Sequence, residues 1–173
     1  MKAKKKPDFD VINDKLAEAR KFLSELRQHN RLQGRPERPS PDNFQYNLSA
    51  FLTAARSISE LIERTVKQNW KNDLTEPEKA LHQWFRSTRK KSVHHGRIET
   101  IREAKEVPVR FDPSAYYHRP PHNFSFSQSM FGEAYTYAET YYFRFCGKKR
   151  EVVELCEEYI ALLSRVVANL ANG

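Results

Sequence analysis

The sequence predicts an all-α fold: an antiparallel bundle of four to five helices with a small β-hairpin or irregular insertion before the last helix. Two observations predict it. Apolar residues recur at steps of three and four in four separate segments, which is the period of an amphipathic helix. The stretch between the third and fourth segments alternates instead and is rich in Tyr, Phe and Thr, as strands are. Short connections between helices favour antiparallel packing.

The first helix is predicted over residues 9–29, with Asp8 or Asp10 able to cap its start. The following segment, "RLQGRPERPSP", holds one glycine and three prolines and is typical of an exposed loop. The second helix follows Asp42 as its N-cap and continues to Val66 with the strongest period in the chain. Its run "SAFLTAARS" supplies small side chains against which another helix can pack closely.

The third helix is predicted to start at a capping box formed by Thr75 and Glu78 and to stop at Gly96. Residues 97–146 form the insertion, in which "VPVRF", "FSF" and "YTYAETYYFRF" alternate as short strands do. The helical period returns from Lys149 and continues into the last helix.

Length and composition bound the function. The 173 residues fit one domain, 1–173, with a core of its own, and residues 1–7 are expected to be a flexible basic tail. Hydrophobic residues make up 39% and charged residues 30%, which argues against wholesale disorder. The formal charge of +8 makes polyanions such as RNA, or an acidic protein surface, candidate partners.

Cysteine usage and hydropathy predict a cytoplasmic protein. Cys146 and Cys156 are too few and too isolated for a disulfide framework or a zinc site, which indicates a reducing compartment. No apolar run reaches the roughly 18 residues of a membrane span. The basic start "MKAKKK" leads into "PDFD" rather than into an apolar signal core, so we expect no membrane association.

We expect no metal and no cofactor. His118 and His122 have the spacing of helical metal ligands, but Pro120 and Pro121 between them are incompatible with such a helix. The chain has only five glycines and no glycine-rich phosphate loop, which excludes nucleotide-dependent motor or kinase chemistry.

Aromatic residues late in the insertion have two interpretations. On a nucleic-acid surface they would stack on bases, whereas on a short strand alternating aromatics usually cover a core, and we favour the core. The residues concerned are Tyr135, Tyr137, Tyr141 and Phe143.

The third helix ends in "RKKSVHHG". Cations in the last turn of a helix are favourable beside its carbonyl groups, by about 0.3 to 1 kcal/mol each, which alone accounts for the cluster. The functional interpretation is that His moves protons and Arg holds phosphate. Arg86, Lys90 and His94 share one helix face, whereas Arg89 and His94 lie about 140° apart. For Arg89 and His94 to serve one site, the helix must end or loosen near His94, or a partner chain must complete the site.

The order of these segments resembles the HEPN superfamily: a long helix with "FQYNLSAFLTAARSISELI", a helix ending in "FRSTRKKSVHHG", a Tyr-rich stretch, and a last helix "EVVELCEEYIALLSRVV". The motif of that family is an Arg, four to six residues and a His at the end of the third helix. Arg89 and His94 match it with four residues between them. The resemblance implies a helical bundle that pairs two-fold, so that two motifs face one another. It also implies a metal-independent endoribonuclease of a toxin or defence system, with RNA and an antitoxin-like protein as partners.

Carried onto this chain, the mechanism uses His94 for the proton at the RNA 2′-hydroxyl and Arg89 for the charge on the scissile phosphate. His95 also fits the motif spacing, with five residues between it and Arg89, and is the rival of His94. Binding residues are expected around the motif and, as a phosphate contact or an ion-paired surface residue, on the second helix. They are Arg86, Lys90, Lys91, His95 and Arg56.

A non-catalytic module of the same fold is the alternative function. In the family the residue after the motif Arg is often Asn, Asp or His, and here it is Lys90. A lysine contacts phosphate but cannot accept a hydrogen bond that would orient an imidazole. This interpretation predicts dimerisation and salt-sensitive binding of RNA or an acidic protein without turnover.

Overall fold

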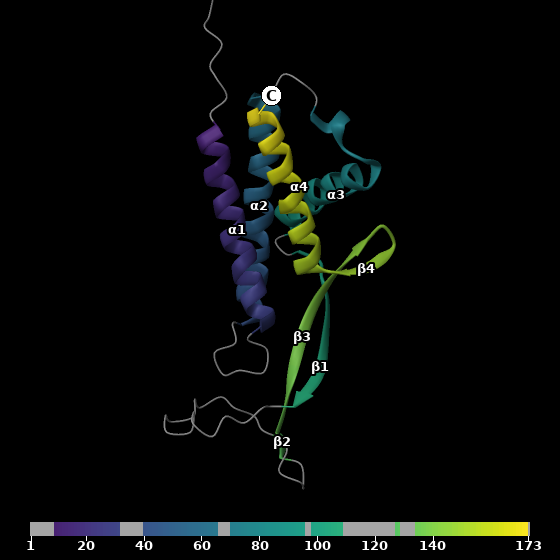
Figure 1. Ribbon diagram of the computed structural model, residues 1–173. Coiled ribbons are helices and arrows are strands. Elements are labelled where there is room, and N and C mark those ends of the chain that lie inside the picture. The colour runs from purple at the N-terminus through teal and green to yellow at the C-terminus, as the bar shows by residue number, and fades with distance from the viewer. Residues whose placement is uncertain are drawn as a thin grey trace, which may run out of the picture.

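The computed structural model describes residues 9–31, 40–65, 70–95, 98–108, 127–128 and 134–172 (Figure 1). Its mainly helical character confirms the coarse fold class, and a short 3-10 helix accompanies the four predicted helices. The helices are α1 (Phe9–Arg31), α2 (Pro41–Thr65), η1 (Trp70–Asp73), α3 (Glu76–His95) and α4 (Val152–Asn172). The predicted basic tail 1–7, and His118 and His122, lie outside the described residues.

Two helix starts have different outcomes. At α3 the amide of Thr75 donates to Glu78 Oε2 at 2.9 Å, which confirms this half of the predicted capping box. At α2 the prediction that Asp42 is the N-cap is wrong. Ser40 caps the helix, because its hydroxyl accepts a hydrogen bond from the amide of Asn43 at 3.3 Å. Asp42 lies in the first turn of α2, where its negative charge still favours the positive end of the helix.

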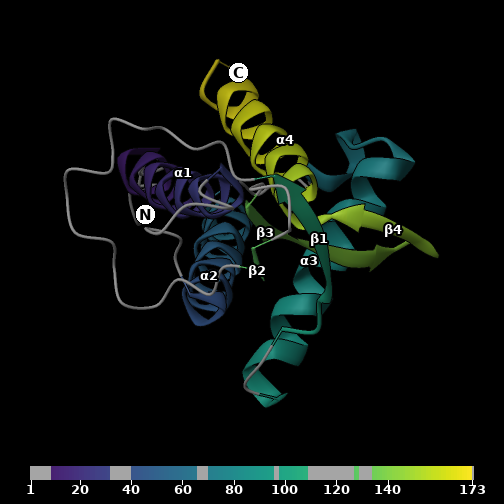
Figure 2. The same ribbon diagram turned by 90° about the horizontal axis from the view of Figure 1, so that it is seen from below.

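The helices do not form a regular four-helix bundle. Figure 1 shows α1 and α2 antiparallel, with α4 beside them and pointing in the same direction as α2. Helix α3 runs across the other three, as Figure 2 makes clear from below. The predicted antiparallel packing therefore holds for α1 and α2 but does not extend to α3, one end of which projects away from the other helices.

Three strands of the predicted insertion and a fourth just after it form a four-stranded antiparallel sheet, which is larger than the predicted small hairpin. Strand β3 is central: β1 pairs with it on one side, and β2 and β4 pair with it elsewhere along its length. The strands are β1 (Ile101–Pro108), β2 (Ser127–Gln128), β3 (Ala134–Phe145) and β4 (Lys148–Glu151). In Figure 1 the β1 and β3 ladder extends away from the helices as an arm.

The last helix starts later than predicted. Lys149 pairs with Arg144 in the β3–β4 ladder, so it belongs to a strand rather than to α4. A two-residue turn joins β3 to β4, and both of its residues have positive φ: 48° at Cys146 and 75° at Gly147. Strand β4 runs directly into α4 and thereby fixes the sheet to the helical core.

One hydrophobic cluster joins the helices to β3. Tyr141 and Phe143 are 3% and 1% exposed, which confirms the core interpretation for these two aromatics. The ring of Tyr141 stacks on Phe44 of α2 at 3.9 Å between centroids. Tyr135 and Tyr137 lie on β3, but their side chains are outside the described part of the chain.

Candidate functional site

Helix α3 carries both residues of the predicted motif. It is helical through His95, so Arg89 and His94 lie on one continuous helix, about 140° apart around its axis. The helix ends one residue after His94, so both arrangements that would let the two residues serve one site, an ending of the helix near His94 or completion by a partner chain, stay open. Arg89 is half-buried, whereas the side chains of Lys91, His94 and His95 lie outside the described residues.

A pocket of about 570 Å³ lies against the exposed side of α3, between that helix and η1. Arg86 and Lys90 both line it, which confirms that these two residues share a helix face. By helical period, position 94 continues the same face. The lining residues are Lys71, Asn72, Leu74, Lys79, His82, Gln83, Arg86, Ser87 and Lys90.

Glu63 of α2 partly neutralises this pocket. Its Oε1 lies 2.7 Å from Lys71 Nζ and 3.2 Å from Arg86 Nη1, so one carboxylate holds η1 and α3 to α2. Burial raises the pKa of Glu63. The hydrogen bond from Lys71 and the charges of Lys71 and Arg86 outweigh burial and leave the pKa below its ordinary value. Glu63 therefore remains ionised at neutral pH.

The half of the pocket nearer the predicted motif keeps a net positive charge. Lys90 is exposed and makes no ion pair within the described part of the chain. Lys79, at the other end, is paired with Glu76 at 2.7 Å. Lys90 thus gives this end of the pocket a positive charge that no described carboxylate matches, and such a charge attracts phosphate.

His82 forms the inner wall of the pocket and was not singled out by the sequence. It is 5% exposed, its Nδ1 lies 2.9 Å from the Tyr159 hydroxyl, and its ring packs edge-on against Trp70 at 5.1 Å. Burial, and then the charges of Lys71 and Arg86, lower the pKa of His82 to about 4. The imidazole is therefore neutral at neutral pH and serves as a core residue. The sequence signal that could have identified His82 is its position four residues before Arg86, which places both residues on one helix face.

Arg56 does not join this site. It is exposed on α2, and its Nε lies 2.6 Å from Glu60 Oε1, one helical turn on. This is the ion-paired arrangement that the sequence left open for Arg56, and the residue is not part of the pocket lining.

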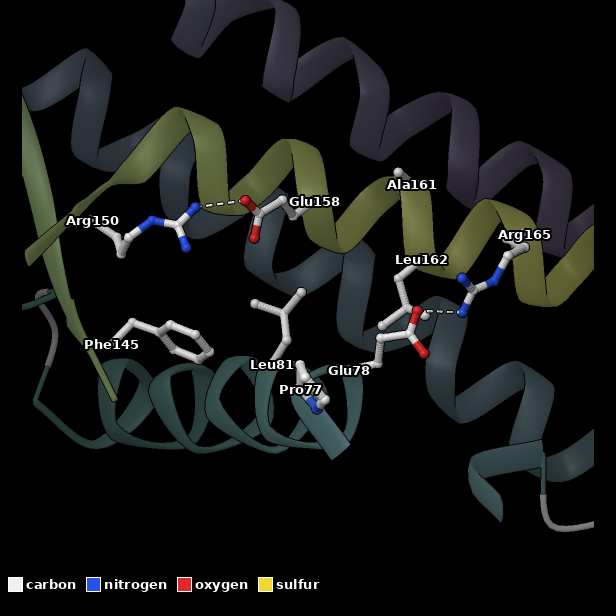
Figure 3. A pocket seen from close by; sticks show the side chains of 9 residues that line it. All are labelled: Pro77, Glu78, Leu81, Phe145, Arg150, Glu158, Ala161, Leu162 and Arg165. Atoms are coloured by element: carbon white, nitrogen blue, oxygen red, sulfur yellow. Dashed lines mark hydrogen bonds and ion pairs between the residues drawn. The ribbon is translucent and has the colours of Figure 1, made fainter. Parts of the chain in front are cut away.

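A second pocket, of about 530 Å³, lies between α3, α4 and the β3–β4 hairpin (Figure 3). Leu81, Phe145 and Leu162 form its apolar floor. Both arginines at its rim already have carboxylate partners: Arg150 bonds Glu158 at 2.5 Å, and Arg165 bonds Glu78 at 2.6 Å. Figure 3 shows these two pairs as dashed lines. Its charges balance, so it lacks the excess positive charge of the first pocket.

Within the described ranges, no group of three or more His, Cys, Asp or Glu side chains is arranged to hold a metal ion. None of the described helices combines the length and apolar character that crossing a membrane requires.

No protein-family model, curated protein or solved structure matches this chain.

Proposed function

We propose that this chain is a HEPN-like, homodimeric, metal-independent endoribonuclease of a toxin or defence system. One observation carries the proposal. The Arg-x4-His spacing of Arg89 and His94 lies on the last turns of α3, directly beyond the basic pocket to which Arg86 and Lys90 belong. The order of two helices, a third helix with the motif, a β-rich insertion and a last helix supports it further.

In the proposed reaction His94 takes the proton from an RNA 2′-hydroxyl, and the 2′-oxygen attacks the adjacent phosphorus. The bond to the 5′-oxygen breaks, a proton is returned to that leaving oxygen, and the products are a 2′,3′-cyclic phosphate and a 5′-hydroxyl. Arg89 stabilises the negative charge that develops on the phosphoryl oxygens. Because the nucleophile is the 2′-hydroxyl, DNA is not a substrate.

The pocket supplies binding in this scheme. Arg86 and Lys90 lie on the helix face that position 94 continues, so they are placed to hold phosphates that flank the scissile one. Contacts of this kind carry no sequence information, and each phosphate neutralised adds about 0.7 to the salt slope of single-strand binding. An antitoxin-like protein partner with an acidic surface would occupy the same face.

Cleavage of a labelled single-stranded RNA in EDTA tests the proposal. We expect cleavage by the wild type and a decrease in rate of about 10²- to 10⁴-fold for His94→Ala and for Arg89→Ala. His95→Ala separates the two candidate histidines and should retain activity if His94 is the acid–base group. Lys21→Ala, at an exposed lysine of α1 that does not line the pocket, is the control and should retain full activity. Absence of cleavage above the His94→Ala background would refute ribonuclease activity. Loss of activity in His95→Ala alone would transfer the acid–base role to His95.

A mixture of two inactive variants tests whether the site is shared between chains. If Arg89 of one chain acts with His94 of another, a heterodimer of Arg89→Ala and His94→Ala keeps one intact site. Mixing the two variants should then restore activity, up to about half per heterodimer after equilibration. If both residues act within one chain, every site lacks one of them and no activity returns.

A non-catalytic binding module is the second candidate, and the environment of Lys90 favours it. This lysine is exposed within the pocket and offers a charge to phosphate, but it cannot accept the hydrogen bond that would orient an imidazole. In this case RNA binds with a strong salt dependence and is recovered intact, and Lys90→Ala weakens binding while His94→Ala does not.

A further inference from the structure

Strand β1 forms an edge of the described sheet. Its full length, Ile101–Pro108, pairs with β3 on one side, and no described strand pairs with the other side. Residues 102–105 are exposed along this edge. An eight-residue edge whose backbone groups no described strand pairs with is a template for pairing with another strand.

The order of charges along this edge is self-complementary when two copies of the strand run antiparallel. Glu103 and Lys105 flank Ala104, and all three are exposed. We propose that β1 pairs antiparallel with β1 of a second copy of this chain, about a two-fold axis through Ala104. Each Glu103 then lies opposite Lys105 of the other copy, and two opposite-charge pairs surround the axis. Opposite charges directly across neighbouring strands stabilise antiparallel pairing.

The register is selective. An axis perpendicular to the sheet keeps each face on the same side, so the positions that face one another differ by an even number of residues. A shift by one step in one direction centres the pair on Glu103 and places two glutamates opposite each other. A shift in the other direction centres it on Lys105 and places two lysines together. Of these three registers, only the one centred on Ala104 avoids like charges at the axis.

The outer positions agree with this register. In this register Ile101 lies opposite Val107 of the other copy, which pairs two apolar residues. Arg102 lies opposite Glu106, which pairs opposite charges. Within its own chain Arg102 pairs with Glu139, and Glu103 pairs with Lys149. Lys105 makes no ion pair in the described part of its own chain, so its charge is available to the second copy.

This interface is separate from the contact through α3 that the proposed ribonuclease uses. Positions 101 and 107 are six steps apart along the strand, so the two copies of Ile101 lie about 20 Å apart along the strands. The β1 contact is made by a different element from α3. It adds a second self-association surface, which does not depend on Arg89 or His94.

Charge reversal tests the proposal in the full chain by sedimentation velocity. Lys105→Glu places two glutamates opposite each other and should weaken the β1 contact by about tenfold or more, and Glu103→Lys should do the same with lysines. An equimolar mixture of the two variants regains both opposite-charge pairs and should associate as the wild type does. Lys21→Glu, an exposed lysine on α1, is the matched control and should change nothing.

The outcomes are distinct. Weakened association of each variant alone, with recovery on mixing, supports pairing of β1 about Ala104. The proposal is overturned if Lys105→Glu associates as strongly as the wild type. It is also overturned if both variants lose association and mixing does not restore it. A wild type that shows no association through this edge at its highest soluble concentration overturns it as well. RNA cleavage measured on the same samples reports on the proposed function separately, because neither variant alters the motif or its pocket.

Discussion

The Nδ1 atom of His82 on α3 lies 2.9 Å from the hydroxyl of Tyr159 on α4, inside the core. Tyr159 is 1% exposed, and its ring stacks on Phe85 at 4.2 Å between centroids. This polar contact ties the crossing helix α3 to the last helix at the wall of the basic pocket. Because α3 packs across its neighbours, such a specific contact restricts both its angle and its rotation.

Replacing Tyr159 by Phe should destabilise the fold. The ring packing is kept, but His82 loses its partner at Nδ1, and its Nε2 already has none in the described structure. We expect a loss of about 1 to 3 kcal/mol in the free energy of unfolding, measured by urea denaturation. Tyr46→Phe removes the same hydroxyl from a residue that is 69% exposed and should leave stability unchanged. Equal stability of both variants would contradict a structural role for the contact.

Stability should fall as the pH falls from 7 to 5, in part because of His82. The pKa of this imidazole is about 4 in the folded chain, below its ordinary value of 6.5, so the unfolded chain binds the proton more readily. The stabilisation that the neutral His82 contributes is fully present above pH 6.5 and is lost as the pH falls toward 4. The free energy of unfolding should decrease by about 2 kcal/mol between pH 7 and 5 for this reason. Urea unfolding at several pH values should show a shallower pH dependence in His82→Gln, and the same slope in both proteins would refute this origin.

Local signals in the sequence predicted the helices well. The capping box of Thr75 and Glu78 and the apolar periods located α1, α2 and α3 to within about two residues, because the same short-range interactions that define the patterns also define the helix ends. The extent of the sheet was not predictable in this way. Lys149 and Arg150 are compatible with a helix start, and only their pairing with β3 makes them a strand.

The candidate site was predictable in part. Arg86 and Lys90 could be assigned to one face from helical geometry alone, and both line the pocket. Glu63 and His82 could not be linked to them, because their proximity depends on how α3 crosses α2 and α4. Contacts between distant segments follow from packing angles, and a single sequence carries no direct record of these.

The two cysteines should differ sharply in reactivity. Cys146 is exposed in the β3–β4 turn, whereas Cys156 is fully buried in α4. Burial, and then the charge of Glu157, raise the pKa of Cys156 well above its ordinary value, so little thiolate forms. With a thiol reagent such as DTNB we expect one fast equivalent in the native protein and the second only on unfolding. Cys146→Ser should abolish the fast phase, and two fast equivalents would contradict the burial of Cys156.

Glu63→Gln should tighten RNA binding. The carboxylate holds Lys71 and Arg86 at 2.7 and 3.2 Å, so removing its charge leaves both cations available to phosphate. We expect tighter binding to single-stranded RNA at low salt, a difference that shrinks as salt is added, and an increase of up to about 1 to 2 in the slope of log K against log[salt]. Fluorescence anisotropy over a salt series measures all three quantities.

Glu60→Gln is the control for this substitution, because it makes the same charge change on the same helix, one turn away. Glu60 pairs with Arg56, which does not line the pocket, so any effect of this variant reports only the change in net charge. If RNA binds in the pocket beside α3, the Glu63→Gln variant must bind RNA more tightly than the Glu60→Gln variant. Its slope of log K against log[salt] must also be steeper. Equal effects of the two variants would mean that RNA responds to overall charge, and this pocket would then no longer explain binding.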